Sequence, residues 1–392
     1  MKTSGETTVN LRLLQLTRAR GVGPILGRRL LETFGSADAA VEASEAALRA
    51  IRGVGRRKAA DLRRALHDAE AVARAEIDAA SERGVRFLTG DDEAYPDLLA
   101  ELPDAPLILS VRGRLRPHDQ PAWPVAIVGS RRCTPYGVEQ AERFAATLAT
   151  AGLTVVSGGA RGVDTAAHRA CLRAEGHTIA VLGCGLGRCY PPENRDLFDA
   201  IVANGGAIVS ELPLETTPAP ENFPARNRII SGLSLGVLVV EAPKRSGALI
   251  TARIALEEHG RDVAAIPGRV SDVAAAGANG LIKSGEAALV ETARDVIDLL
   301  ETPARHRMMG RHDTRYAPAP LPADQPTPPR PRVDPSTLSP VQRQILDLLE
   351  SPRSLDELVR RTDAPPSELL PALTMLEMRQ LVRRAGGAFE RL

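Results

Sequence analysis

Cations follow most of the apolar runs in the central part of the chain. The runs span residues 125–129, 153–157, 178–183, 207–210, 236–241 and 262–266. Arginine or lysine comes after five of the six runs, supplied in chain order by Arg131, Arg132, Arg161, Arg188, Lys244, Arg245 and Arg269. Glycine and serine lie among these cations, so guanidinium groups and unobstructed backbone N–H donors occur together. A polyanion such as a nucleic acid requires that combination.

The same six runs predict a parallel β-sheet. Each run is apolar throughout, and stretches long enough for a helix separate them, as in strands buried on both faces of a sheet. We therefore predict the α/β class, with a Rossmann-like doubly wound parallel sheet over residues 91–302. Ligands bind beyond the carboxyl ends of such strands, so the cations should converge on one edge. This region contains 20 Lys and Arg against 27 Asp and Glu, so the edge would be cationic on an acidic domain.

Residues suited to catalysis are scarcer in this region. Asp164 and His168 are four apart on a predicted helix, and Glu241 ends a predicted strand. Asp164 opens its helix after a glycine turn, so we expect it to be a helix cap and His168 to be a half-buried structural residue. The run 183–188 lacks the third glycine of a dinucleotide fingerprint, and no GKS or GKT sequence forms a P-loop. We predict no cofactor and keep a Rossmann-type nucleotide hydrolase as an alternative function.

Two glycine turns organise the predicted all-α domain at residues 1–90. Gly21-Val22-Gly23 and Gly53-Val54-Gly55 lie 32 residues apart, each between apolar helical stretches. The pattern resembles a SAM-like tandem of helix-hairpin-helix units, in which glycines let backbone N–H groups at a helix start approach a phosphate. The cations of residues 56–58 follow the second turn, whereas Pro24 follows the first and removes one N–H donor. The pattern is explained equally well by two tight turns between helices that pack together in a small domain without a DNA-binding role.

Proline marks a boundary after the α/β region. Residues 303–337 contain nine prolines without apolar periodicity, which predicts a linker. Residues 338–392 regain a helical pattern and end in a glycine-containing hairpin, which predicts a winged-helix domain. Its expected recognition helix, residues 366–380, carries more acidic than basic side chains, so we favour a protein contact over duplex binding. A winged-helix transcriptional regulator remains a further alternative.

The composition of the chain indicates in which cellular compartment the protein is expected. No window of about 18 uncharged apolar residues exists, so no membrane span is expected, and the polar start of the sequence indicates no secretory signal. The four cysteines are too few for a disulfide scaffold, and their spacing fits no zinc pattern. We therefore expect a cytoplasmic protein without bound metal. Aromatic residues make up 3% of the chain, which argues against a surface built mainly from stacked bases.

Five ordered motifs in residues 91–290 resemble one family. They read AIVGSRRCTPYG (126–137), VVSGGARGVDTAAH (155–168), IAVLGCGLGRCYPPEN (179–194), ENFPARNRIISGLSLGVLVVEAPKRSGALITAR (221–253) and VAAIPG (263–268). Together they are similar to the DNA processing protein A family, also called DprA or Smf. The resemblance implies a non-enzymatic protein that binds and protects incoming single-stranded DNA in natural transformation. It also implies that the protein loads the RecA recombinase and forms a homodimer.

The resemblance and the cations at the predicted strand ends together define an expected DNA-binding set. It comprises Gly129, Ser130, Arg131, Arg132, Ser157, Gly158, Gly159, Arg161, Phe223, Arg226, Asn227, Arg228, Lys244, Ser246, Gly247, Thr251 and Arg253. Phe223 and Tyr136 are the only aromatic residues in the loops that this set implicates. We therefore expect contact mainly through phosphates, with one or two bases held in a pocket.

Overall fold

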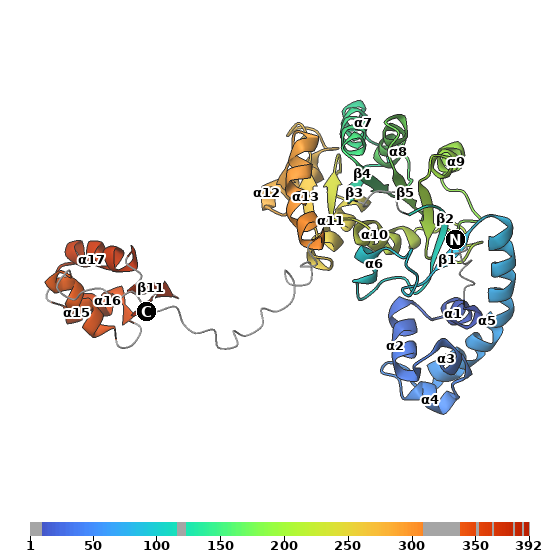
Figure 1. The fold of residues 1–392 in the computed structure, drawn as a ribbon, viewed down its shortest axis with the longest axis horizontal. Helices are drawn as coiled ribbons and strands as arrows, with labels where there is room; N and C mark the ends of the chain where they lie inside the picture. Colours follow the sequence, from blue (N-terminus) through green and yellow to red (C-terminus); the bar gives the residue numbers. More distant parts are fainter. Residues whose placement is uncertain are drawn as a thin grey trace, which may run out of the picture. The chain divides into compact units, whose positions relative to one another are not determined.

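The computed structural model describes residues 10–115, 123–308, 338–349, 353–362, 364–378, 381–385 and 388–391. The chain divides into two units, Met1–Ala317 and Pro318–Leu392 (Figure 1). The first unit contains a helical domain followed by an α/β domain, and the second contains short helices and a three-stranded sheet. None of the helices in the described ranges combines the length and apolarity that crossing a lipid bilayer requires.

The helical domain consists of two hairpins that share one apolar core. Its helices are α1 (Leu11–Arg18), α2 (Pro24–Phe34), α3 (Ala37–Glu42), α4 (Glu45–Arg49) and α5 (Arg56–Glu82). The two predicted glycine turns have the same geometry, because Gly21 and Gly53 have φ of 88° and 86°. Gly23 and Gly55 are the N-caps of α2 and α5. The predicted tandem of helical hairpins is therefore confirmed.

The α/β domain is built on a nine-stranded sheet. Its strands are β1 (Arg86–Leu88), β2 (Leu109–Gly113), β3 (Trp123–Val128), β4 (Leu153–Ser157), β5 (Thr178–Val181), β6 (Ala207–Ser210), β7 (Gly236–Val239), β8 (Asp262–Ala265) and β9 (Ala288–Leu289). They lie in the order β1-β2-β6-β5-β4-β3-β7-β8-β9, and the seven strands from β6 to β9 are parallel. The order reverses between β3 and β7, which makes the crevice beyond these two strands the expected ligand site.

Helices cover both faces of this sheet. They are α6 (Asp97–Ala100), α7 (Pro135–Thr150), α8 (Val163–Arg173), α9 (Arg195–Ala203), α10 (Asn222–Gly232), α11 (Gly247–Glu257), α12 (Ala276–Ser284) and α13 (Ala293–Met308), with a 3-10 turn at Pro192–Asn194. Ile127 packs with α7 and α8 in one apolar cluster, whereas its neighbour Val128 packs with α10 and α11 in another (Figure 1). Neighbouring strand residues thus face opposite layers, as the uniformly apolar runs predicted, and the doubly wound fold is confirmed.

Two predicted boundaries differ from the elements observed. Strand β1 pairs with β2 in the sheet, although residues 86–88 fall in the predicted helical domain. A three-residue edge strand is too short for periodicity to reveal it. Helix α13 continues through Pro303 to Met308 and so extends into the predicted linker. A proline favours a helix boundary at the residue before it but does not require one. The rest of that predicted linker, residues 309–337, lies outside the described residues.

The second unit has the predicted winged-helix architecture. Helices α15 (Pro340–Leu348), α16 (Leu355–Arg361) and α17 (Pro366–Met378) accompany a sheet in the order β10-β12-β11, from strands Arg353–Ser354, Ala388–Arg391 and Val382–Ala385. Ser339 and Gln342 form a reciprocal capping box at the start of α15. Leu346, Leu358 and Phe389 share the small apolar core.

A buried ion pair joins the helical domain to the α/β domain. Arg18 of α1 donates to both carboxylate oxygens of Glu76 in α5, at 2.6 and 2.9 Å. These side chains are only 3% and 6% exposed. The same carboxylate accepts the backbone N–H of Leu214 at 2.8 Å, so one carboxylate connects α1, α5 and a loop of the α/β domain.

Replacing Glu76 by alanine should lower the free energy of unfolding by about 3 kcal/mol. The change leaves the buried Arg18 guanidinium and the Leu214 N–H without their acceptor. Chemical denaturation followed by circular dichroism measures the effect. Glu70→Ala on the same helix is the control, because its ion pair with Arg74 is much more exposed and should contribute under about 1 kcal/mol. Identical midpoints for the wild type and Glu76→Ala would contradict the proposed importance of this pair.

Candidate nucleic-acid interface

A pocket of about 840 Å³ opens beyond the carboxyl ends of β3 and β7, where the strand order reverses. Ten of the seventeen predicted residues line it: Gly129, Ser130, Arg131, Arg132, Phe223, Arg226, Asn227, Ser246, Gly247 and Thr251. They come from the turn after β3 and from the N-terminal parts of α10 and α11. Arg245 also lines the pocket.

The turn after β3 is held by backbone bonds from both sides. Ser130 N–H donates to the carbonyl of Glu241 at 2.7 Å, and the Ser130 carbonyl accepts the N–H of Val163 at 3.2 Å. The carboxylate of Glu241 accepts both the N–H and the hydroxyl of Thr134, at 2.9 and 2.6 Å. A Cβ on Gly129 would lie 2.6 Å from a Val163 methyl group, so only glycine fits there. This frame leaves the two arginines that follow Ser130 exposed at the pocket.

Arg131 lies on an aromatic pair at one side of the pocket. Its guanidinium carbon is 4.5 Å from the ring centre of Phe223. The Phe223 ring is in turn 5.6 Å from that of Tyr190, at an interplanar angle of 43°. Tyr190 also lines the pocket and is not among the seventeen predicted residues; the sequence signal for it is its place in the third motif, after β5. Tyr136, the other aromatic residue of the predicted loops, donates its hydroxyl to the Pro267 carbonyl.

Two buried charged residues, Arg226 and Asp164, form the floor of the pocket. Arg226 is 6% exposed and donates to the carbonyls of Gly158 and Val181. Burial raises the pKa of Asp164 and lowers the pKa of Arg226 to about 10, which still leaves this guanidinium charged at neutral pH. A Cβ on Gly158 would lie 2.7 Å from atoms of both side chains. Arg226 therefore fixes the loop after β4, and its charge is largely used within the protein.

Asp164 does not have the capping role predicted for it. The N-cap of α8 is Gly162, and the Asp164 carboxylate instead accepts the N–H of Ala160 at 3.2 Å. The carboxylate turns back onto the preceding loop because Arg226 lies on that side and supplies the opposite charge. Ser157 and the two glycines after it lie behind the pocket; the Ser157 hydroxyl donates to the Ile127 carbonyl at 2.6 Å.

Four of the predicted cations do not line the pocket, namely Arg161, Arg228, Lys244 and Arg253. Arg228 is only 12% exposed and pairs with Glu211 and, at 3.5 Å, with Asp104. Arg161 pairs with Glu193, and Arg253 lies 3.7 Å from Glu257 on its own helix. Each of these arginines has a carboxylate within reach that the strand pattern does not reveal. Lys244 is exposed beside the pocket without lining it.

The three candidate catalytic residues, Asp164, His168 and Glu241, all form hydrogen bonds within the protein. Asp164 and Glu241 hold the loop contacts described above. His168 is fully buried rather than half-buried, with Nδ1 2.8 Å from the Thr178 hydroxyl, and burial lowers the pKa of His168 to about 3. Among the described residues, no group of three His, Cys, Asp or Glu side chains could hold a metal ion.

The fold defines a class of three-part proteins, in which a doubly wound α/β domain follows a tandem of helical hairpins and precedes a winged helix. Family models match each part. "DNA recombination-mediator protein A" matches residues 86–301, "DprA winged helix domain" matches 317–388, and "SAM-like Helix-hairpin-helix tandem" matches 13–68. The chain belongs to the DNA processing protein A (DprA/Smf) family.

Individual relatives agree with this assignment. Protein Smf of Synechocystis is 36% identical over 391 residues, which cover 95% of this chain and 96% of that protein. DNA processing protein DprA of Streptococcus pneumoniae is 46% identical over 207 residues, covering 53% of this chain and 71% of the relative. The X-ray structure of DprA from Streptococcus pneumoniae matches with a TM-score of 0.62 at 34% identity, covering 74% of this chain and 98% of that one.

The buried imidazole of His168 should make the fold sensitive to acid. Its folded-state pKa is about 3, against an ordinary 6.5, so the unfolded chain binds a proton that the folded chain does not between these values. Stability should therefore fall as pH decreases from about 6.5, by up to about 1.4 kcal/mol per pH unit from this group.

Denaturation midpoints at pH 7.5 and pH 5.5 test this expectation with His168→Gln as the comparison. The variant should lose less stability than the wild type between the two pH values. His259, whose pKa is lowered to about 4, contributes equally to both proteins, so the difference isolates His168. The same pH dependence in both proteins would show that His168 is not neutral in the fold.

Proposed function

We propose that this chain is a single-stranded DNA-binding recombination mediator and that the pocket beyond β3 and β7 holds the strand. The observation that carries the proposal is the division of charge at this edge. Arg131, Arg132 and Arg245 are exposed at the pocket and form no ion pair with a described carboxylate, whereas Arg161 and Arg228 are paired. The cations left for a ligand therefore gather at one place.

The pocket's other lining favours an unpaired strand over a duplex. Phe223 and Tyr190 supply aromatic faces, and Pro218, Pro220 and Ile250 supply apolar ones. Bases can stack on such faces only when they are not already stacked within a duplex. The start of α11 adds backbone donors, since Gly247 has open space where a Cβ would lie. Phosphates would then contact the arginines while one or two bases occupy the pocket.

The proposed DNA-contacting set follows from this arrangement. It consists of Gly129, Ser130, Arg131, Arg132, Arg245, Ser246, Gly247, Thr251, Phe223 and Tyr190, with Arg226 and Asn227 positioning the floor and the start of α11. Family membership supports the remaining parts of the proposal: a non-enzymatic cytoplasmic protein that protects incoming DNA in natural transformation, loads RecA and acts as a homodimer. Formation of RecA filaments on coated single strands, with and without the protein, tests the loading step.

Salt titration tests the binding mode. Affinity for oligo(dT), oligo(dA) and a mixed strand should fall steeply with salt, with log K losing about 0.7 per log unit of salt for each phosphate contacted. The three strands should differ little from one another, because phosphates are common to them. A shallow salt slope or a strong sequence preference would contradict the proposal. Release of phosphate or base from nucleotides added in parallel would support the hydrolase alternative.

Arg131→Ala should weaken single-strand binding by about tenfold or more. Its guanidinium is the cation placed directly against the aromatic pair, and a hydrogen bond to a charged group contributes about 1.5–3 kcal/mol. Arg294→Ala is the control, because Arg294 is exposed on α13 and pairs with Asp298 on the same helix. Fluorescence anisotropy with labelled oligo(dT) measures both. Equal losses in the two variants would mean that charge alone, without the pocket, attracts the strand.

A further inference from the structure

The loop that follows β8 presents two valines to solvent beside the pocket. We call residues 267–275 the valine loop, in which Val270 is 98% exposed and Val273 is 77% exposed. Val273 lines the pocket together with Ile250 of α11, which is itself 40% exposed. Apolar side chains stabilise a fold only where folding removes them from water. The two valines therefore contribute little to the fold and remain available to a ligand.

Contacts within the α/β domain hold the valine loop in place. The side-chain amide of Asn279 in α12 accepts the N–H of Gly268 at 3.0 Å and donates to the Gly268 carbonyl at 2.9 Å. Tyr136 donates its hydroxyl to the Pro267 carbonyl, and a Cβ on Gly268 would lie 2.4 Å from the Cβ of Ala275. The loop is therefore held at both ends, and its exposed valines have a defined place beside the pocket.

Cations without carboxylate partners lie at the same end of the pocket. Arg245 lines the pocket, and Lys244 and Arg269 are exposed in the loops after β7 and β8. Within the described ranges, none of these three side chains forms an ion pair. The carboxylate of Asp272, in the valine loop itself, accepts the N–H of Ala274 at 2.9 Å. Cations therefore dominate the exposed charge of these two loops.

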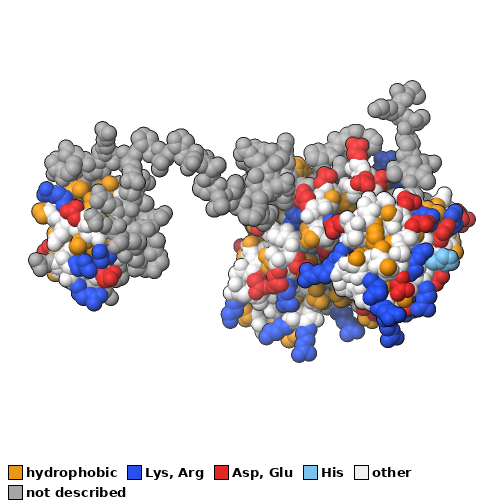
Figure 2. Space-filling view, turned by 90° about the horizontal axis from the view of Figure 1, so that it is seen from below, with side chains coloured by type: hydrophobic (Ala, Val, Ile, Leu, Met, Phe, Trp, Pro, Cys, Tyr) orange, Lys and Arg blue, Asp and Glu red, His pale blue; other side chains and the backbone are white. Residues whose placement is uncertain are grey.

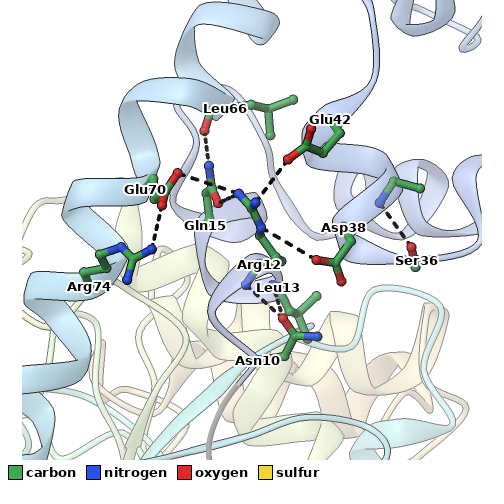
Figure 3. Close-up of polar contacts among 11 residues, drawn as sticks. Asn10, Arg12, Leu13, Gln15, Ser36, Asp38, Glu42, Leu66, Glu70 and Arg74 are labelled. Atoms are coloured by element: carbon green, nitrogen blue, oxygen red, sulfur yellow. Dashed lines mark hydrogen bonds and ion pairs between the residues drawn. The ribbon is translucent and has the colours of Figure 1, made fainter.

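Exposed cations are common on this protein, so charge alone does not mark a site. Figure 2 shows Lys and Arg side chains over much of one face of the first unit, with Asp and Glu among them. Arg12 in the helical domain shows how such a charge is neutralised, since Asp38, Glu42 and Glu70 lie 3.0 to 3.7 Å from its guanidinium (Figure 3). The end of the pocket beside the valine loop differs, because its unpaired cations lie next to exposed apolar side chains.

The valine loop and the aromatic pair line the pocket on opposite sides of β3. Tyr190 follows β5 and Val273 follows β8, and the sheet runs β5-β4-β3-β7-β8 between them. Neighbouring strands are about 4.8 Å apart, which places the ends of β5 and β8 about 19 Å from each other. A stacked nucleic-acid strand rises about 3.4 Å per nucleotide, so about six nucleotides would span this distance.

We propose that the valine loop forms a second base site of the pocket, separate from the aromatic pair. Val270, Val273 and Ile250 contact the face of a nucleobase, while Arg245 and Arg269 contact the phosphates of the adjoining nucleotides. The site takes an unpaired nucleotide, because a base within a duplex has its faces covered by its neighbours. The continuity of the loop with the pocket favours a base over a protein partner. This inference rests on the proposed function, since one strand must occupy both sides of the pocket.

Serine replacements in the valine loop of the full chain test the base contact without removing a charge. Val270→Ser with Val273→Ser should weaken binding of a six-nucleotide oligo(dT), written (dT)6, by about fivefold, because apolar contact with the base is lost. The salt slope should stay that of the wild type, since every phosphate contact remains. Fluorescence anisotropy at several salt concentrations measures both quantities.

Val72→Ser is the matched control for these replacements. Val72 is 54% exposed on α5 and does not line the pocket, so this variant should bind (dT)6 within about twofold of the wild type. Thermal unfolding of all these variants should match that of the wild type, because exposed side chains contribute little to stability.

A strand without bases separates base contact from phosphate contact. An abasic six-nucleotide strand keeps its phosphates, so the Val270/Val273 variant should bind it as tightly as the wild type does. Arg245→Ala with Arg269→Ala should weaken binding of (dT)6 and of the abasic strand alike, by about tenfold. It should also lower the salt slope by about 1.4, because each phosphate contact of a single strand contributes about 0.7.

Two results would overturn the second base site. Wild-type affinity of the Val270/Val273 variant for (dT)6 would show that the valines contact no base. Equal losses for (dT)6 and the abasic strand would show that the loop acts on the phosphates instead. Arg131→Ala distinguishes these failures from failure of the pocket itself: if it weakens binding and the valine variant does not, only the second base site is excluded. If neither variant weakens binding, the strand does not occupy this pocket and the proposed function loses its site.

Discussion

The buried Glu241 joins the two halves of the sheet at the point on which the pocket depends. Its carbonyl accepts the N–H of Ser130 from the neighbouring strand end, while its carboxylate holds Thr134 at the start of α7. The turn between these two contacts carries Arg131 and Arg132. These contacts hold both ends of the turn, and its two arginines remain exposed.

Charge pairing then decides which cations remain for a ligand. The edge beyond the strands contains several arginines, and some of them make contacts within the protein. Arg228 pairs with Asp104 and Glu211, and Arg226 donates to a carbonyl in the loop after β4 and to one at the end of β5. An arginine count along the sequence therefore overstates the cationic character of the edge. What distinguishes Arg131 is a partner that is a ring rather than a carboxylate.

The sheet could be predicted from the sequence because its evidence is local. Each of the six central strands is an uninterrupted apolar run, and burial on both faces requires that pattern whatever the neighbouring strand is. The pairing of each arginine could not be predicted, because the partners are distant in sequence: Arg228 and Asp104 are 124 residues apart. Tyr190 was missed for a related reason, since only the folded chain brings its loop against Phe223. Strand β1 was missed because three residues carry no measurable period.

Helix α5 has a consequence for how this protein can be divided. Over 27 residues it extends for about 40 Å, at about 1.5 Å per residue. Ala73 and Ala80 near its end lie in one apolar cluster with Phe87, Ile108 and Leu186 of the α/β domain. The helical domain is therefore not a detachable appendage. A shortened chain that begins after α5 would leave that apolar patch in water, and polar replacements there would be needed to keep such a fragment from self-associating.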